Sequence, residues 1–161
     1  MARMLKEETA SGGLVTTSLH PGHIVGPGWF PIGPLGNFAP AVWRTLSAGR
    51  PLQVPGSGSE MMHHVHADDV AQAFELAIGR RGAAAGEDFN ILAPSALSVR
   101  GYADIAAAWF GQTGTVESVT WGRFREITTP EYVEASWGAS APQPVFHGRE
   151  GQVAPGVRAA V

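Results

Sequence analysis

The sequence predicts an α/β fold, because segments typical of strands alternate along it with segments of helical period. Residues 14–19 are mostly apolar or β-branched, as in a buried parallel strand. Residues 70–78 then carry apolar side chains at i, i+3, i+4, i+7 and i+8, the spacing of an amphipathic helix. Residues 89–92 supply the next extended segment. A strand, a helix and a strand in this order favour a parallel sheet with helical crossovers.

The helices of the chain are expected where capping and stop residues bracket a periodic segment. Residues 1–10 have one apolar face, and Ser11-Gly12-Gly13 ends that helix. Pro40 and Gly49 bracket a two-turn helix over residues 41–48.

Three more helix signals follow. Asp68 is the expected N-cap of the helix over residues 70–78, whose apolar face should meet a core shared with strands 14–19 and 89–92. Ser98 caps a helix that Gly111 closes, and Thr129-Pro130 starts a last short helix. Short strands are expected at residues 52–54, 63–66 and 116–119.

Composition excludes several classes of function. The 161 residues carry 11 basic and 14 acidic side chains, a net charge of −3, so neither nucleic acid nor an anionic membrane is an expected partner. Without cysteine there is no disulfide, thiolate metal site or cysteine nucleophile. The longest apolar run, residues 105–110, is too short to span a bilayer. We expect a cytoplasmic protein.

Two motifs resemble those of the NAD-dependent epimerase/dehydratase family, the extended short-chain dehydrogenases/reductases. Residues 19–28, Leu-His-Pro-Gly-His-Ile-Val-Gly-Pro-Gly, are similar to the family's Leu-Arg-Pro-x-Asn-x-Tyr-Gly-Pro-Gly. Residues 64–73, His-Val-His-Ala-Asp-Asp-Val-Ala-Gln-Ala, are similar to its Phe-Val-His-Val-Asp-Asp-Val-Ala-x-Ala. The resemblance covers residues 1–137. It implies the C-terminal part of a Rossmann-type parallel sheet plus the small substrate domain, incomplete without an N-terminal half.

The resemblance also implies the site residues. In the family the stretch matching Pro21, Gly22 and His23 walls the nicotinamide of NAD or NADP, and His23, Asn37 and Met62 fall at substrate-binding positions. The physics of open sheets agrees, because ligands lie beyond the carboxyl ends of parallel strands. From residue types alone, Pro21-Gly22 is equally typical of a tight turn with no ligand.

The histidines and aspartates around residue 66 have structural explanations. His64 and His66 share a strand face while His63 points away, and two histidines without a third ligand make a poor zinc site. We therefore predict no metal. Asp68 and Asp69 resemble a carboxylate pair, but a place at a helix N-terminus explains them as cap and dipole partner.

Three departures from the family limit the functional prediction. The chain has no glycine-rich turn from a strand into a helix, and neither Tyr102 nor Tyr132 has a lysine four positions on. Because the family's acid/base is its Tyr-x-x-x-Lys tyrosine, we assign no catalytic residue and expect weak or no cofactor binding by this chain alone. Met62 replaces the arginine that grips a nucleotide-sugar diphosphate in many members, which favours a small carbonyl or hydroxyl substrate.

Two functions stay open. The first is a fragment of an NAD(P)-dependent oxidoreductase or epimerase, inactive alone and completed by an N-terminal half. The alternative is a non-catalytic binding or assembly module that pairs with another chain or forms a homodimer. Residues 138–161 lack apolar periodicity and are expected to be an irregular tail, either disordered or unrelated to the family. The sequence leaves open the substrate and the choice of NAD or NADP.

Overall fold

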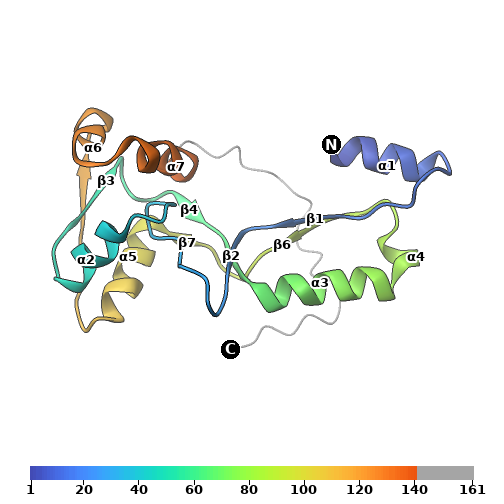
Figure 1. Ribbon diagram of the computed structural model, residues 1–161, viewed down its shortest axis with the longest axis horizontal. Helices are drawn as coiled ribbons and strands as arrows, with labels where there is room; N and C mark the ends of the chain where they lie inside the picture. The colour runs from blue at the N-terminus through green and yellow to red at the C-terminus, as the bar shows by residue number, and fades with distance from the viewer. Residues whose placement is uncertain (141–161) are drawn as a thin grey trace. The chain divides into compact units, whose positions relative to one another are not determined.

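A computed structural model describes residues 1–140 and confirms the α/β class, with parallel strand pairs and helices (Figure 1). These residues form two compact units, and the chain passes through each unit twice. Among these residues, unit 1 comprises residues 1–28 and 63–95, and unit 2 comprises residues 29–62 and 96–140. None of the described helices is long and apolar enough to cross a membrane.

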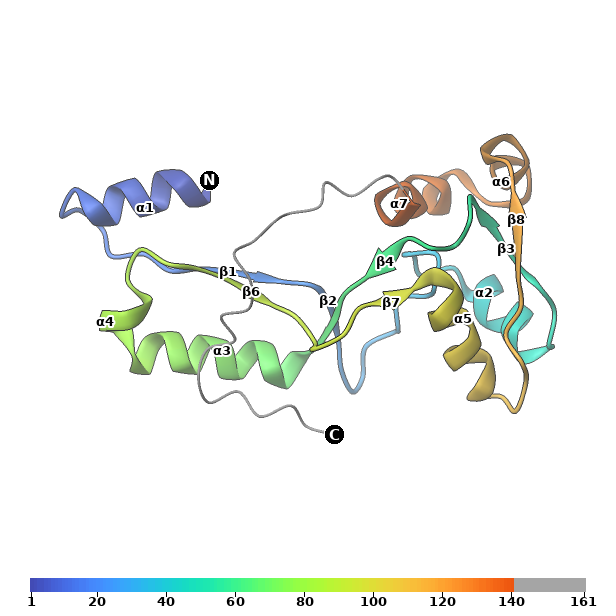
Figure 2. The same cartoon turned by 180° about the vertical axis from the view of Figure 1, so that it is seen from behind.

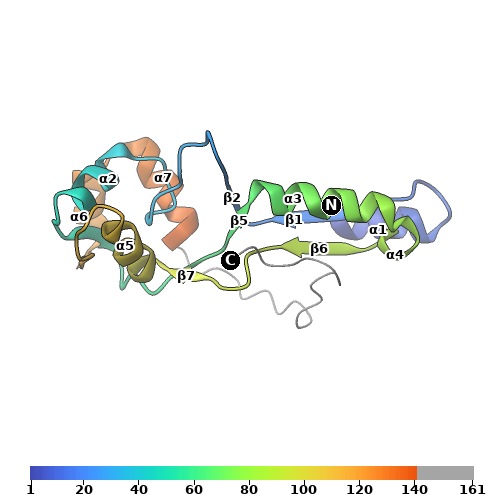
Figure 3. The ribbon, with the colours of Figure 1, turned by 90° about the horizontal axis from the view of Figure 1, so that it is seen from below.

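Unit 1 contains two parallel strand pairs and a long helix. β1 (Ser18–Pro21) pairs with β6 (Asp88–Ile91), and β2 (His23–Val25) pairs with β5 (His64–His66). α3 (Ala67–Gly79) follows β5 and runs along β1 and β6, as Figures 2 and 3 show. The remaining elements of unit 1 are two short helices, α1 (Ala2–Ala10) and α4 (Arg81–Ala84).

Strand β1 begins later than the sequence suggested. Residues 14–17 are not part of a strand, and Leu14 is 70% exposed. The reason is that β6, the partner of β1, begins only at Asp88, opposite Ser18. Before that point the chain is held by side chains, with Thr16 bonded to the backbone of Leu5 and Thr17 to that of Ala84.

The predicted core face of α3 is only partly correct. Val70 is buried, whereas Phe74 is 54% and Ile78 is 78% exposed. The helix has two apolar stripes, and the one that packs on the strands contains Val70, Ala73 and Ala77. The second stripe, Phe74 and Ile78, is not buried by any other described element of unit 1.

Unit 2 has the larger apolar core. Its helices are α2 (Pro40–Ser47), α5 (Val99–Ala108), α6 (Trp121–Ile127) and α7 (Pro130–Ser140). Its strands are β3 (Leu52–Pro55), parallel to β8 (Val116–Val119), and β4 (Met61–Met62), antiparallel to β7 (Leu97–Ser98). The side chains of Leu46, Val54 and Phe124 lie at the centre of the core, each no more than 1% exposed.

The expected helix ends of unit 2 are confirmed. Pro40 is the first residue of α2, and Gly49 has the positive φ of 63° that a residue just past a helix end often requires. The Ser98 hydroxyl accepts a hydrogen bond from the Gly101 amide at the start of α5. Helix α6 and the two-residue strands β4 and β7 were not predicted. The predicted boundary after Trp137 stays a prediction, and of the tail, residues 141–161 lie outside the described part of the chain.

Candidate functional site

The chain changes its strand partner at Gly22, inside the first sequence motif. The Gly22 amide donates to the carbonyl of Ile91 at 3.1 Å, whereas the His23 amide donates to the carbonyl of His63 at 2.8 Å. The Ala93 amide in turn donates to the carbonyl of His64. Strand β5 therefore enters beside β2 where β1 and β6 reach their carboxyl ends, the place where ligands of parallel sheets bind.

Position 22 requires a glycine because the segment that leads into β5 lies so close to its backbone. A Cβ atom at this position would lie 2.6 Å from the carbonyl oxygen of His63 and 2.9 Å from Cδ2 of Leu92. The space that the missing side chain leaves is thus filled by the protein's own backbone and is not an open cradle for a ring. Packing explains Gly22, while the predicted contact of Pro21, Gly22 and His23 with a nicotinamide stays a prediction.

His23 has an imidazole nitrogen that no described residue satisfies. Its Nδ1 is buried and has no hydrogen-bond partner among residues 1–140. Its ring contacts that of His64, with centroids 5.5 Å apart. Burial lowers the pKa of His23. Burial also lowers the pKa of His64, and the positive charges that His23 and His63 can carry lower it further. Both rings are therefore neutral at neutral pH and can donate or accept a hydrogen bond.

The cap of α3 is His66 and not Asp68, which corrects the sequence interpretation. Nδ1 of His66 accepts a hydrogen bond from the Asp68 amide at 3.2 Å. Asp68 and Asp69 lie in the first turn, where their charges favour the positive end of the helix dipole. A histidine nitrogen can take the role of the usual aspartate because the cap needs only an acceptor within reach of the N2 amide. Among the described residues, no three histidine or carboxylate side chains come together to form a metal site.

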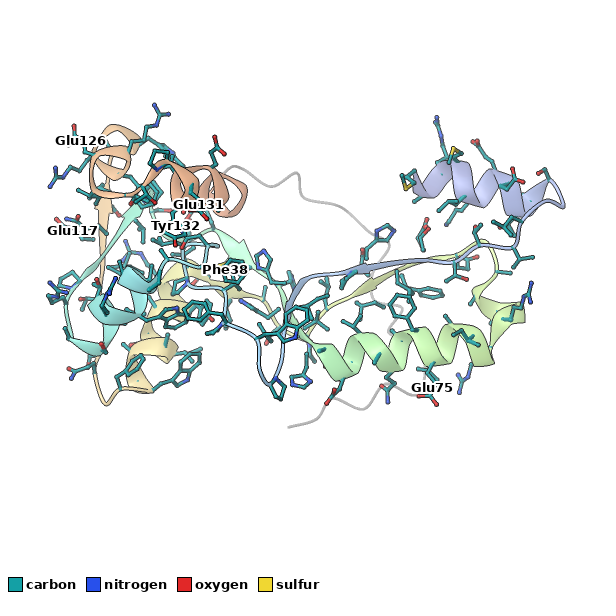
Figure 4. The ribbon with its side chains drawn as sticks, viewed as in Figure 1. Phe38, Glu75, Glu117, Glu126, Glu131 and Tyr132 are labelled. Atoms are coloured by element: carbon teal, nitrogen blue, oxygen red, sulfur yellow. The ribbon has the colours of Figure 1, made fainter. Side chains whose placement is uncertain are left out.

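Asn37, a predicted substrate residue, is fully engaged inside unit 2. It is 1% exposed, and its Nδ2 donates to Oγ of Ser136 at 2.7 Å and to the carbonyl of Tyr132 at 3.4 Å. Its Oδ1 accepts from the Ala39 amide at 3.0 Å. Asn37 thereby ties the loop before α2 to α7, where Tyr132 is labelled in Figure 4. Both N–H groups of the Asn37 amide donate to α7, so a ligand would have to displace α7 to reach them.

Met62, the other predicted substrate residue of unit 2, lies in the core. It is 2% exposed and belongs to the apolar cluster that also contains Leu46 and Phe124. Burial explains why an apolar side chain stands here, and it leaves little of Met62 for a ligand to contact. Its substrate role stays a prediction that the geometry does not favour.

Sequence reasoning missed an aromatic cluster on unit 2. Trp43 of α2 stacks on Trp109 at the end of α5, with ring planes 15° apart, and Tyr102 meets both edge-on. The Tyr102 hydroxyl donates to the Ile32 carbonyl at 2.7 Å, and burial raises the pKa of Tyr102 to about 12. A shallow apolar hollow lies beside the stacked indoles, lined by Phe30, Pro31, Pro40, Trp43, Trp109 and Phe110. The available signal was an aromatic residue on each of the two helices, Trp43 on α2 and Tyr102 on α5.

Solved structures resemble this chain in fold. A UDP-glucose 4-epimerase from Thermotoga maritima, solved with UDP-glucose, is 22% identical with a TM-score of 0.52, over 73% of this chain and 37% of that one. A dTDP-glucose 4,6-dehydratase from Streptomyces venezuelae, solved with NAD, is 21% identical with a TM-score of 0.53, over 75% and 37%. An epimerase from Methanothermobacter thermautotrophicus is 18% identical with a TM-score of 0.52, over 84% and 46%.

These likenesses establish the fold, and the chain spans less than half the length of each of the three proteins. No curated protein matches the chain. The description of one protein family does match: that of the NAD-dependent epimerases/dehydratases, over residues 1–91. This match includes both sequence motifs, the partner change at Gly22 and the whole of unit 1 up to the end of β6. Since it covers more than half of the 161 residues, the chain belongs to the NAD-dependent epimerase/dehydratase family.

Proposed function

We propose that the chain supplies the nicotinamide-facing strand end and the substrate domain of an NAD(P)-dependent oxidoreductase or epimerase. The observation that carries the proposal is the family match across the strand end at Pro21, Gly22 and His23. There the orphaned Nδ1 of His23 offers a hydrogen bond to a ligand. NAD or NADP would supply hydride transfer, and this chain would supply the wall beside the reacting atoms.

The substrate class in this proposal is a small molecule with a carbonyl or hydroxyl group. Two neutral imidazoles at the strand end suit an uncharged oxygen better than a phosphate, which favours cationic partners. Met62 is apolar and buried, so it offers no positive charge to a diphosphate. We therefore propose a substrate of the reductase type and not a nucleotide sugar.

We propose further that the chain is inactive alone and binds its cofactor weakly. It contains neither a glycine-rich turn between a strand and a helix nor a Tyr-x-x-x-Lys pair. In this fold those elements hold the pyrophosphate at a helix N-terminus and supply the proton. Calorimetric titration of the chain with NADH and with NADPH should show no binding at micromolar concentrations. A micromolar or tighter dissociation constant would contradict this proposal.

The decisive test adds the elements that this chain lacks. A segment carrying the glycine-rich turn and the Tyr-x-x-x-Lys pair, taken from another family member, is co-expressed with the chain. The complex should bind NADH and oxidise it in the presence of small aldehydes or ketones. His23→Phe should weaken turnover, whereas His20→Gln, on the exposed part of β1, should not. A folded complex that binds no cofactor would refute the proposal.

A second candidate, a non-catalytic assembly module, is favoured by one specific observation. Unit 1 exposes Phe74 and Ile78 on one side of α3, an apolar stripe that a partner chain could cover. The two candidates differ in what the co-expressed segment does. Under the module hypothesis it binds without restoring cofactor affinity, or the chain prefers a second copy of itself.

A further inference from the structure

His23 and His64 lie directly opposite each other on β2 and β5. They are partners in the parallel register, as are Ile24 with Val65 and Val25 with His66. Their ring planes meet at 64° in an edge-to-face contact, with centroids 5.5 Å apart. Paired residues of neighbouring strands project to the same face of a sheet, so the register itself produces this contact.

The polar environment of His23 is incomplete. Nδ1 of His23 is buried without a hydrogen-bond partner among the described residues. A buried polar atom without a partner loses its hydrogen bonds to water and gains none in return, so such atoms in native proteins call for an explanation. The strand end in front of the pair, where Gly22 exchanges β6 for β5, is where a ligand of this fold would lie.

We infer that His64 positions His23 for an oxygen atom of the ligand. The edge-to-face contact holds the imidazole of His23 in one orientation and leaves its Nδ1 for a carbonyl or hydroxyl oxygen. His23 is then the group that touches the ligand, and His64 acts through it. The inference deepens the proposed function and rests on it for the source of that oxygen.

Burial keeps this hydrogen-bonding group neutral, because it lowers the pKa of His23. Burial also lowers the pKa of His64, and the charges that His23 and His63 can carry lower it further. The other titratable groups on β5 and α3 are His66 of β5 and Asp68, Asp69 and Glu75 of α3, and His63 directly precedes β5. His66 is held separately by the Asp68 amide. A neutral imidazole has one donor and one acceptor nitrogen, which suits an uncharged oxygen.

The test uses the full chain with ¹⁵N-labelled histidine. Two-bond ¹H–¹⁵N spectra report the tautomer and the titration of each ring between about pH 5 and 8. In the unmodified chain His23 should show one predominant tautomer. His64→Phe should keep that tautomer and the lowered pKa of His23, because the ring contact and the burial remain. His64→Ala should shift both His23 nitrogens toward the values of a tautomer mixture.

Two further variants keep the result interpretable. His20→Gln, on β1 but outside the pair, should change neither the tautomer nor the titration of His23. If His64→Ala disturbs the amide spectrum, His64→Gln removes the ring with less loss of volume and should give the same shift. An identical His23 tautomer and titration in the unmodified chain and in His64→Gln would overturn the inference.

The outcome is separable from that of the proposed function. A folded complex with the co-expressed segment that binds no cofactor would refute the proposed function and leave the histidine spectra of the chain unaffected. Unchanged His23 spectra in His64→Gln would overturn the inference that His64 positions His23, and the cofactor prediction would still stand.

Discussion

At the residue scale, Gly22 and His23 combine a packing requirement with a chemical one. Gly22 admits the backbone of β5, and His23 follows it with a buried nitrogen that the described residues leave unsatisfied. The sequence motif identified both residues, but it revealed neither the close approach of β5 nor the unsatisfied nitrogen. The contacts come from His63, His64 and Leu92, at least 40 positions along the chain, and no local pattern encodes such a register.

Gly22→Ala should destabilise the chain by roughly 1–3 kcal/mol, the range for overpacking a filled site. The new Cβ would meet a backbone oxygen, which cannot rotate away. Gly79→Ala is the matched control, because a Cβ there meets nothing within 4 Å and alanine favours the helix end. The urea concentration at the denaturation midpoint should therefore be lowest for Gly22→Ala, higher for the unmodified chain and highest for Gly79→Ala. A Gly22→Ala midpoint equal to that of the unmodified chain would contradict the close approach of β5.

Acidification should weaken unit 1 through the two histidines. The folded pKa of His23 and of His64 lies below the unfolded value of 6.5, so the unfolded chain binds these protons more readily. The contribution of the two neutral histidines to the stability of unit 1 is fully present above about pH 6.5 and is lost as the pH falls through the folded pKa values. The denaturation midpoint should thus decrease as the pH is lowered from about 7.5 to 5.5, and it should decrease less steeply in His64→Phe. Equal slopes in the two proteins would count against the shift in His64.

At the element scale, α3 shows what periodicity can and cannot predict. Its apolar spacing identified the helix, but the same residues form two stripes, and only the stripe with Val70 packs on the strands. On the outer side of the helix Glu75 points away from β1 and β6 (Figure 4). Which stripe is buried depends on the neighbouring elements, and this information is absent from the helix itself.

Phe74→Ala should accordingly change stability by less than about 0.5 kcal/mol, as is usual for surface positions. Sequence reasoning alone implied a core residue, whose loss would cost roughly 3–5 kcal/mol. Leu46→Ala in unit 2 is the contrast, since Leu46 is 1% exposed and should cost roughly 2–5 kcal/mol. Thermal melting of both variants decides the matter, and a large loss in Phe74→Ala would mean that this stripe is covered.

The elements that the sequence did not reveal are short or masked by composition. Strands β4 and β7 have two residues each, too few for any period. Strand β2 lies inside residues 19–28, whose proline and glycine content is typical of a loop. Helix α6 did leave a signal, because the Thr120 hydroxyl accepts from the Arg123 amide as an N-cap. Asn37 went unexplained for another reason: its partner Ser136 is 99 residues away.

At the scale of the whole molecule, the two units differ in how well they are filled. The apolar core cluster lies in unit 2, where α2, α5, α6 and β3 all contribute. In the described part of unit 1 the buried apolar residues are Val65, Val70 and Ala84. Strand β1 pairs with β6 alone among the described strands, so one of its edges has no strand partner there. A thin core and an open edge favour association with another chain.

We therefore expect the chain to self-associate unless a complementary segment is present. Light scattering should show dimers or larger species at high concentration. Lysine at both Phe74 and Ile78 should reduce their amount, because charge on the second stripe of α3 opposes burial. Ile127→Lys, at a similarly apolar but 40% exposed position of unit 2, is the control and should have no such effect. A stable monomer at high concentration would contradict the expectation.

The exchange of partners at Gly22 makes two adjacent amides independent reporters of local opening. The Gly22 proton is released only when β1 separates from β6, and the His23 proton only when β2 separates from β5. In deuterated water their exchange rates measure the opening free energies of the two strand pairs, one residue apart. A molecule that binds at the histidine pair, on β2 and β5, would slow the exchange of His23 more than that of Gly22. Two consecutive peptide groups thus show which of the two strand pairs a partner stabilises.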